Sequence, residues 1–82
     1  MQPDDLRTLV TMRMPFGKYQ GTILADLPGA YLGWFAQRGF PEGRLGELLG
    51  LMHEIHHNGL RDLLIPLRDE EGRRRALDRR GR

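Results

Sequence analysis

Eleven glycines and five prolines divide this chain of 82 residues into short segments, and they set where its helices and strands can begin and end. A chain of this length has room for one compact core and not for two domains. It has no cysteine, so neither disulfides nor a cysteine-ligated zinc can reinforce that core. We therefore expect one small domain in which glycine and proline mark the ends of the elements.

The segment between residues 11 and 24 predicts a β-hairpin. Residues 11–16 and 22–24 form two short extended pieces, because Pro15 biases Met14 away from the helical region. The loop between them, residues 17–21, has a glycine at each end, which suits a tight reversal of the chain. β-branched residues are scarce elsewhere, so no further β-structure is expected.

Two helices are expected in the first half of the chain. Asp4 and Asp5 can cap a short N-terminal helical turn. Asp26 can cap a second helix, which runs to a stop at Gly39. Both helices would pack on the hairpin.

The second half predicts one long helix and one short helix. Apolar residues recur with helical spacing over roughly residues 41–58, and the Asn-Gly pair at 58–59 suits the end of that helix. The apolar stretch of residues 60–67 predicts a short helix that ends or kinks at Pro66. The predicted fold is therefore α+β, a short β-hairpin packed on two or three helices, in a single domain of residues 1–67.

Basic residues are concentrated at the C-terminal end. Residues 1–67 carry a net charge of −1, whereas residues 68–82 carry +3. The tail arginines that could contact a ligand are Arg73, Arg74, Arg75, Arg79 and Arg80. Because almost nothing apolar lies among them, burial cannot offset the entropy of ordering, and we expect a disordered tail or a frayed helix. Such a tail could bind phosphates non-specifically, or it could simply be solvated.

Residues 53–57, with the sequence His-Glu-Ile-His-His, match the H-E-x-x-H pattern of zinc hydrolases. On a helix this spacing supplies two imidazole ligands and a glutamate as general base. The alternative is structural, with His56 packed in the core and His53 and His57 on the surface. Because so short a chain leaves little wall for a substrate cleft, we favour the structural reading and predict no metal and no cofactor. His53 and His57 are the remaining metal candidates.

One longer pattern is more specific. Residues 14–21 read M-P-F-G-K-Y-x-G, and residues 26–35 read D-L-P-x-x-Y-L-x-W-F. Together they resemble a family of short bacterial proteins described as putative quorum-sensing-regulated virulence factors, a likeness that extends over roughly residues 10–68. The resemblance implies a shared fold and no assigned biochemical role. A shorter version of the pattern is similar to the C-terminal appendage of exodeoxyribonuclease-X-type exonucleases, which accompanies a nuclease domain acting on DNA.

The glycine-bounded loop is the candidate binding site. Gly17 and Gly21 permit a tight turn with positive φ, so that Lys18 points to solvent and Tyr19 can offer a stacking face. Arg38 lies on the following helix. A lysine among aromatic rings can hold a phosphate backbone or an unpaired base. The alternative is that the large rings form the core, which we favour for Phe16, Trp34 and Phe35.

The leading hypothesis is thus a non-enzymatic module that binds nucleic acid, DNA or RNA, through this loop and the basic tail. The second is a protein-protein adaptor or homodimer, formed along the flank of Gly46 and Gly50 or through residues 60–67. The zinc hydrolase is a remote third. No secretory signal follows Met1 and no apolar stretch could span a bilayer, so we expect a cytoplasmic protein without a membrane partner.

Overall fold

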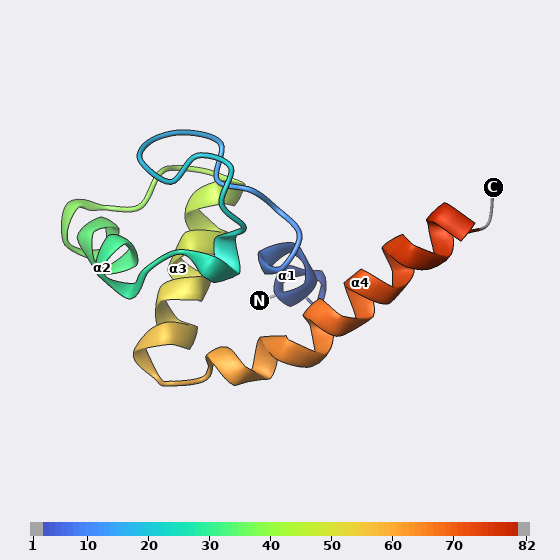
Figure 1. Ribbon diagram of the computed structural model, residues 1–82. Coiled ribbons are helices and arrows are strands. Elements are labelled where there is room, and N and C mark those ends of the chain that lie inside the picture. Colours follow the sequence, from blue (N-terminus) through green and yellow to red (C-terminus); the bar gives the residue numbers. More distant parts are fainter. Residues whose placement is uncertain (1–2, 81–82) are drawn as a thin grey trace.

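The computed structural model describes residues 3–80 of the chain, and the side chains of residues 4–74. Its elements in order are α1 (Pro3–Leu9), the 3-10 turn η1 (Leu24–Asp26), α2 (Gly29–Arg38), α3 (Arg44–His57), the 3-10 turn η2 (Arg61–Leu64) and α4 (Ile65–Arg80). α1, α2 and α3 gather around one core, and α4 runs away from it (Figure 1). The core is rich in leucine, and its fully buried side chains are Leu9, Met14, Leu24, Leu27, Leu32, Leu48, Leu49, Met52 and Leu64.

The described residues contain no β-strand, so the predicted α+β fold with a hairpin was wrong. The chain does reverse between residues 13 and 23, but a single antiparallel bridge, Arg13 to Ile23, closes the reversal. Backbone hydrogen bonds from the amides of Met14, Gly21 and Leu24 cross the reversal, but the turn takes the amide of Thr22, which a regular ladder would need. The amides of Gln20 and Thr22 bond to the carbonyls of Gly17 and Tyr19, at 3.1 and 3.0 Å. Too few paired residues remain to form strands.

Helix α3 is the central element, and its end matches the sequence prediction. It buries Leu48, Leu49, Met52 and Ile55. Gly59 has φ +69°, and the amide of Leu60 donates to the carbonyl of Ile55 at 2.8 Å. This pattern is a Schellman-type helix end.

The two predicted helix starts on either side of α2 were placed wrongly. Asp26 does not cap α2; it lies in η1 and its carboxylate accepts a hydrogen bond from Arg68. α3 begins at Arg44 rather than at Pro41, because Gly43 takes φ +84° immediately before it. Arg44 also pairs with the buried Asp5 at 2.6 Å and so joins α3 to α1.

The loop between α2 and α3 lies directly against α3. A β-carbon on Gly46 would stand 1.6 Å from the carbonyl oxygen of Pro41, and one on Gly50 would stand 3.9 Å from the ring of Phe40. The chain's own loop therefore packs tightly at Gly46 and makes an ordinary contact at Gly50. That loop occupies the flank that had been considered for a second copy.

The C-terminal part differs from the prediction at Pro66. Pro66 does not end a helix; it lies in the first turn of α4, where its missing N–H has no intrahelical partner to lose. Residues 68–80 of the tail continue helix α4. Arg7 pairs with Glu70 at 3.1 Å, and Arg74 lies 3.8 Å from Glu70 within the helix, which supports its early turns. Arg73 and Arg74 are exposed on α4. The side chains of Arg75, Arg79 and Arg80 lie outside the described residues.

Candidate functional site

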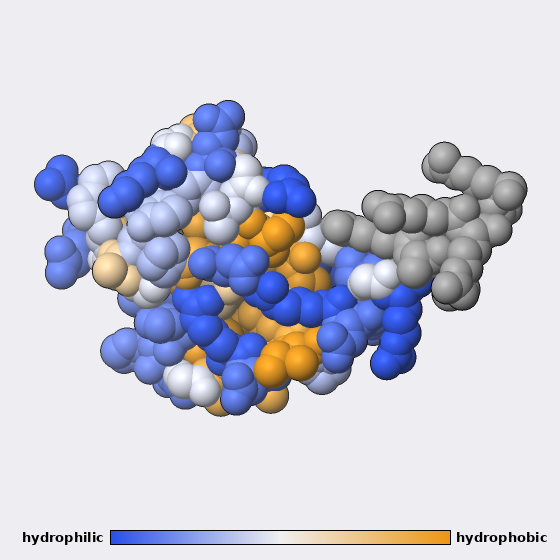
Figure 2. All heavy atoms as spheres, viewed as in Figure 1, coloured by the Kyte–Doolittle hydropathy of each residue, from blue (hydrophilic) through white to orange (hydrophobic). Residues whose placement is uncertain are grey.

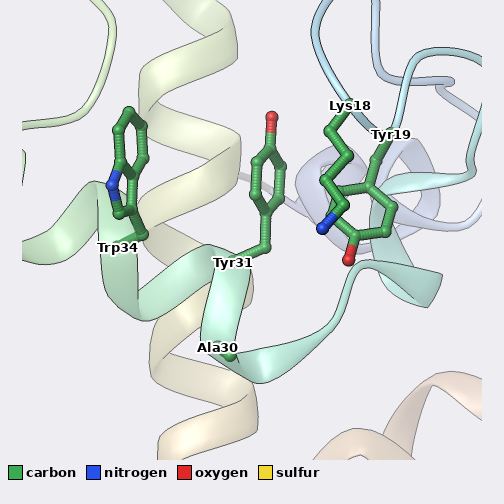
Figure 3. A pocket seen from close by; sticks show the side chains of 5 residues that line it. All are labelled: Lys18, Tyr19, Ala30, Tyr31 and Trp34. Carbon is green, nitrogen blue, oxygen red and sulfur yellow. The ribbon is translucent and has the colours of Figure 1, made fainter.

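An open groove of about 360 Å³ lies between α2 and the loop of residues 17–21. Figure 3 shows the five residues that line it, Lys18, Tyr19, Ala30, Tyr31 and Trp34. α2 contributes three of them, and the rings of Tyr31 and Trp34 stand side by side because residues three apart share a helix face. The volume is within the range of small-molecule binding sites.

The loop wall of the groove depends on its two glycines. Gly17 and Gly21 have φ +81° and +88°, as the sequence predicted. A β-carbon on Gly17 would stand 3.2 Å from the hydroxyl oxygen of Tyr31, so the backbone comes close to that ring. Arg13 donates to the carbonyl of Gly21 at 2.7 Å and holds the far end of the loop.

The aromatic rings of the groove support one another edge to face. The ring centroids of Tyr19 and Tyr31 are 4.7 Å apart, and those of Tyr31 and Phe35 are 5.0 Å apart. The rings of Trp34 and Phe35 also meet edge to face, with centroids 5.1 Å apart. Since Phe35 is buried, it anchors the exposed rings to the core. Burial, and secondarily the neighbouring Tyr19, raise the pKa of Tyr31 above its ordinary value.

A cation lies beside a ring on each side of the groove. The ammonium of Lys18 is 5.5 Å from the centroid of the Tyr19 ring. The guanidinium of Arg38 is 5.2 Å from the centroid of Trp34, one helical turn along α2. Among the described residues, no carboxylate lines the groove. The arrangement therefore favours a ligand that is flat and negatively charged.

The sequence predicted several residues that the structure brings to this groove. Lys18 and Tyr19 line the groove, Arg38 contacts its Trp34 wall, and Gly17 and Gly21 shape the loop. The sequence did not predict Ala30 and Tyr31, which α2 brings to the same groove.

Two aromatic side chains that were assigned to the core are instead exposed. Trp34 is 48% exposed and Phe16 is 46% exposed, and only Phe35 of the three is buried. The helical spacing could have predicted the exposure of Trp34, because Tyr31 and Trp34 flank a face of α2 whose buried members are Leu32 and Phe35.

The histidines of the H-E-x-x-H pattern do not form a metal centre. The described residues contain no group of three or more histidine, aspartate or glutamate side chains that could hold a metal ion. His53 lies between Phe40 and His57, with ring centroids 6.2 and 5.9 Å away. His56 was expected in the core but is exposed, and its ring lies against Gly29 at the start of α2. Its Nδ1 accepts a hydrogen bond from Arg61 at 2.9 Å.

The chain matches known sequences over most of its length. The sequence model of a family described as "Putative quorum-sensing-regulated virulence factor" matches residues 2–67. The chain belongs to this family. The matched region contains the whole groove and ends near the start of α4.

Two relatives carry the name "Uncharacterized protein YpeB", one from Escherichia coli strain K12 and one from E. coli O157:H7. Each is 45% identical to the chain over 69 residues, which cover 83% of this chain and 96% of the relative. No solved structure matches the chain. None of the helices within residues 3–80 combines the length and apolarity needed to cross a membrane.

Proposed function

We propose that this family member is a non-enzymatic module that binds single-stranded nucleic acid in the groove between α2 and the loop of residues 17–21. Unpaired bases stack on Trp34 and Tyr31. Lys18 and Arg38 meet the adjoining phosphates. The role is binding rather than catalysis, and a nucleic-acid ligand is our reason for proposing a cytoplasmic location.

The observation that carries the proposal is the lining of the groove. Three aromatic rings are gathered there, a cation contacts a ring on each side, and the described lining holds no carboxylate. Base stacking on an aromatic side chain is worth about 1–3 kcal/mol, and every base has a face that can stack. A concave groove reaches bases that are splayed out, whereas the bases of a duplex are already stacked on one another. The resemblance to the appendage of nucleases that act on DNA also supports this choice.

Trp34 provides a direct test, because it is the single tryptophan of the chain. We expect its fluorescence to be quenched when a single-stranded oligonucleotide of about 10 nucleotides is added, within the usual site size of such modules. A duplex of the same sequence should bind more weakly. The proposal fails if neither DNA nor RNA single strands change the emission at low salt, or if the duplex binds as tightly.

Substitutions distinguish binding in the groove from unspecific electrostatic attraction. With a dye-labelled oligonucleotide at moderate salt, Trp34→Ala should weaken binding about ten- to a hundredfold through lost stacking. Lys18→Ala should reduce the slope of affinity against salt concentration by about 0.7, the value for one phosphate contact on a single strand.

The matched controls are Phe16→Ala, which removes an equally exposed ring outside the groove, and Arg73→Ala, which removes an exposed cation of α4. Both should bind nearly as the unaltered chain does. If the controls lose as much affinity as Trp34→Ala and Lys18→Ala, binding is not located in the groove.

A further inference from the structure

A second apolar surface lies away from the aromatic groove. Leu60, Leu63 and Ile65 are 44%, 64% and 51% exposed, an unusual arrangement for three large apolar side chains so close in sequence. They surround the turn η2, which directs Leu64 into the core and leaves its neighbours outside. Figure 2 shows apolar surface in the lower part of the view, where Figure 1 places the chain between α3 and α4.

This surface borders a groove of about 280 Å³ whose walls come from α1, α3 and η2. Its apolar lining consists of Leu6, Leu51, Ile55, Leu60, Leu63 and Leu64. The polar lining residues are Glu54 and Asn58. The side-chain amide of Asn58 donates to the backbone carbonyl of Glu54 at 2.8 Å, so that group is already satisfied. The floor is therefore apolar, with a carboxylate at its edge.

Among the described residues that line the groove, the charged side chain is an acidic one, Glu54. Glu54 is exposed and lines it, and Asp62 is exposed in η2 next to Leu63. The nearest arginine in sequence, Arg61, turns away, since its guanidinium donates to the carbonyls of Ala25 and Leu27 at 2.6 and 2.5 Å. No basic side chain lines this groove within the described part of the chain.

We propose that this groove docks the apolar face of an amphipathic α-helix from another protein, one that carries lysine or arginine beside its apolar residues. Apolar side chains at helical spacing would enter between α1, α3 and η2, and the flanking cations would meet Glu54 and Asp62. Charge disfavours a second copy of this chain as the occupant. A two-fold contact would bring the carboxylates of both copies around the same apolar centre.

Two synthetic peptides of about 14 residues, long enough for a short amphipathic helix, test the proposal. Both have leucines spaced three and four residues apart; one has lysine and the other glutamate at the remaining positions. We expect the lysine peptide to bind the full-length chain at least about tenfold more tightly, with amide NMR shifts at the groove residues. Because the chain has a net charge of +2, unspecific attraction would favour the glutamate peptide.

Variants locate the contact. Leu63→Ser changes an exposed side chain and should abolish peptide binding while the circular dichroism of the chain is kept. Glu54→Gln should remove most of the preference for lysine over glutamate. Lys18→Ala, in the aromatic groove, should leave peptide binding unchanged. The proposal is overturned if neither peptide binds, if both bind equally, or if sedimentation shows a dimer that Leu63→Ser dissociates.

Discussion

At the scale of single residues, two glycines that lie inside helices differ, and only one of the two is tightly packed against a neighbour. A β-carbon on Gly46 would meet the backbone carbonyl of Pro41 at 1.6 Å, whereas one on Gly33 of α2 would meet nothing within 4 Å. Backbone atoms cannot rotate away as a flexible side chain can. Gly46 is thus required by the loop that packs on α3, while Gly33 is not required by any neighbour.

We therefore predict that Gly46→Ala lowers the free energy of unfolding by about 1–3 kcal/mol, the usual cost of overpacking. Gly33→Ala should raise it by about 0.4–1 kcal/mol, because alanine favours the helix and restricts the unfolded chain. Urea denaturation followed by circular dichroism measures both. Gly50→Ala is the control in the same helix as Gly46, since its β-carbon would make an ordinary contact at 3.9 Å. Equal losses for Gly46→Ala and Gly50→Ala would contradict the packing argument.

Among elements, Arg61 joins the two 3-10 turns and the end of α3. Its guanidinium donates to the carbonyls of Ala25 and Leu27, and its Nε donates to the ring of His56. One planar side chain thus satisfies acceptors at η1 and at the end of α3. Arg68, by contrast, forms a single exposed pair with Asp26.

Arg61→Ala should destabilise the chain by about 1–3 kcal/mol, because the two carbonyls lose their charged donors. Arg61→Lys should recover only part of this loss, since an ammonium lacks the planar fork of a guanidinium. Arg68→Ala, with its exposed pair, should cost at most about 1 kcal/mol. Thermal unfolding of the three variants provides the measurement. If Arg61→Lys is as stable as the unaltered chain, the fork geometry is not what joins the elements.

At the scale of the whole molecule, the first turns of α4 contact the rest of the fold, here called the body, whereas its C-terminal half runs away from it. Its contacts with the body include the pairs of Arg68 with Asp26 and of Glu70 with Arg7, both near its start. The family match ends at residue 67, so the rest of this helix lies beyond the shared region. We infer that the core and the aromatic groove do not require its distal half.

Deletion of residues 73–82 should therefore shift Tm by no more than about 2 °C, in keeping with the small energy of exposed pairs. Loss of these arginines should weaken oligonucleotide binding at low salt and leave the Trp34 fluorescence response at moderate salt. A fluorescence titration of the shortened chain at two salt concentrations measures both effects. Loss of the response at moderate salt would show that the tail, rather than the groove, binds the ligand.

The sequence alone determined the reversal at residues 17–21, the end of α3 and the family motif of this protein. Glycine and proline marked the reversal at residues 17–21 and the end of α3, because positive φ and a missing N–H are local properties. The spacing of apolar residues also predicted which face of α3 is buried, because that spacing follows the local helical repeat. The motif at residues 14–21 and 26–35 identified the family, and it contained Lys18 and Tyr19 of the groove.

Features that depend on residues distant in the sequence were decided only by the tertiary structure. Whether the reversal at residues 13–23 became a hairpin depended on how many backbone groups its turn had already used. Whether Trp34 or Phe35 entered the core depended on which face of α2 met α3, and that choice left Trp34 beside Tyr31 in the groove. The packing of α3 likewise buried Ile55 and left His56 exposed. For α3 the local spacing of apolar residues was enough to predict the buried side, but for α2, with large rings on both sides, only the packing of its neighbours decided which ring is buried.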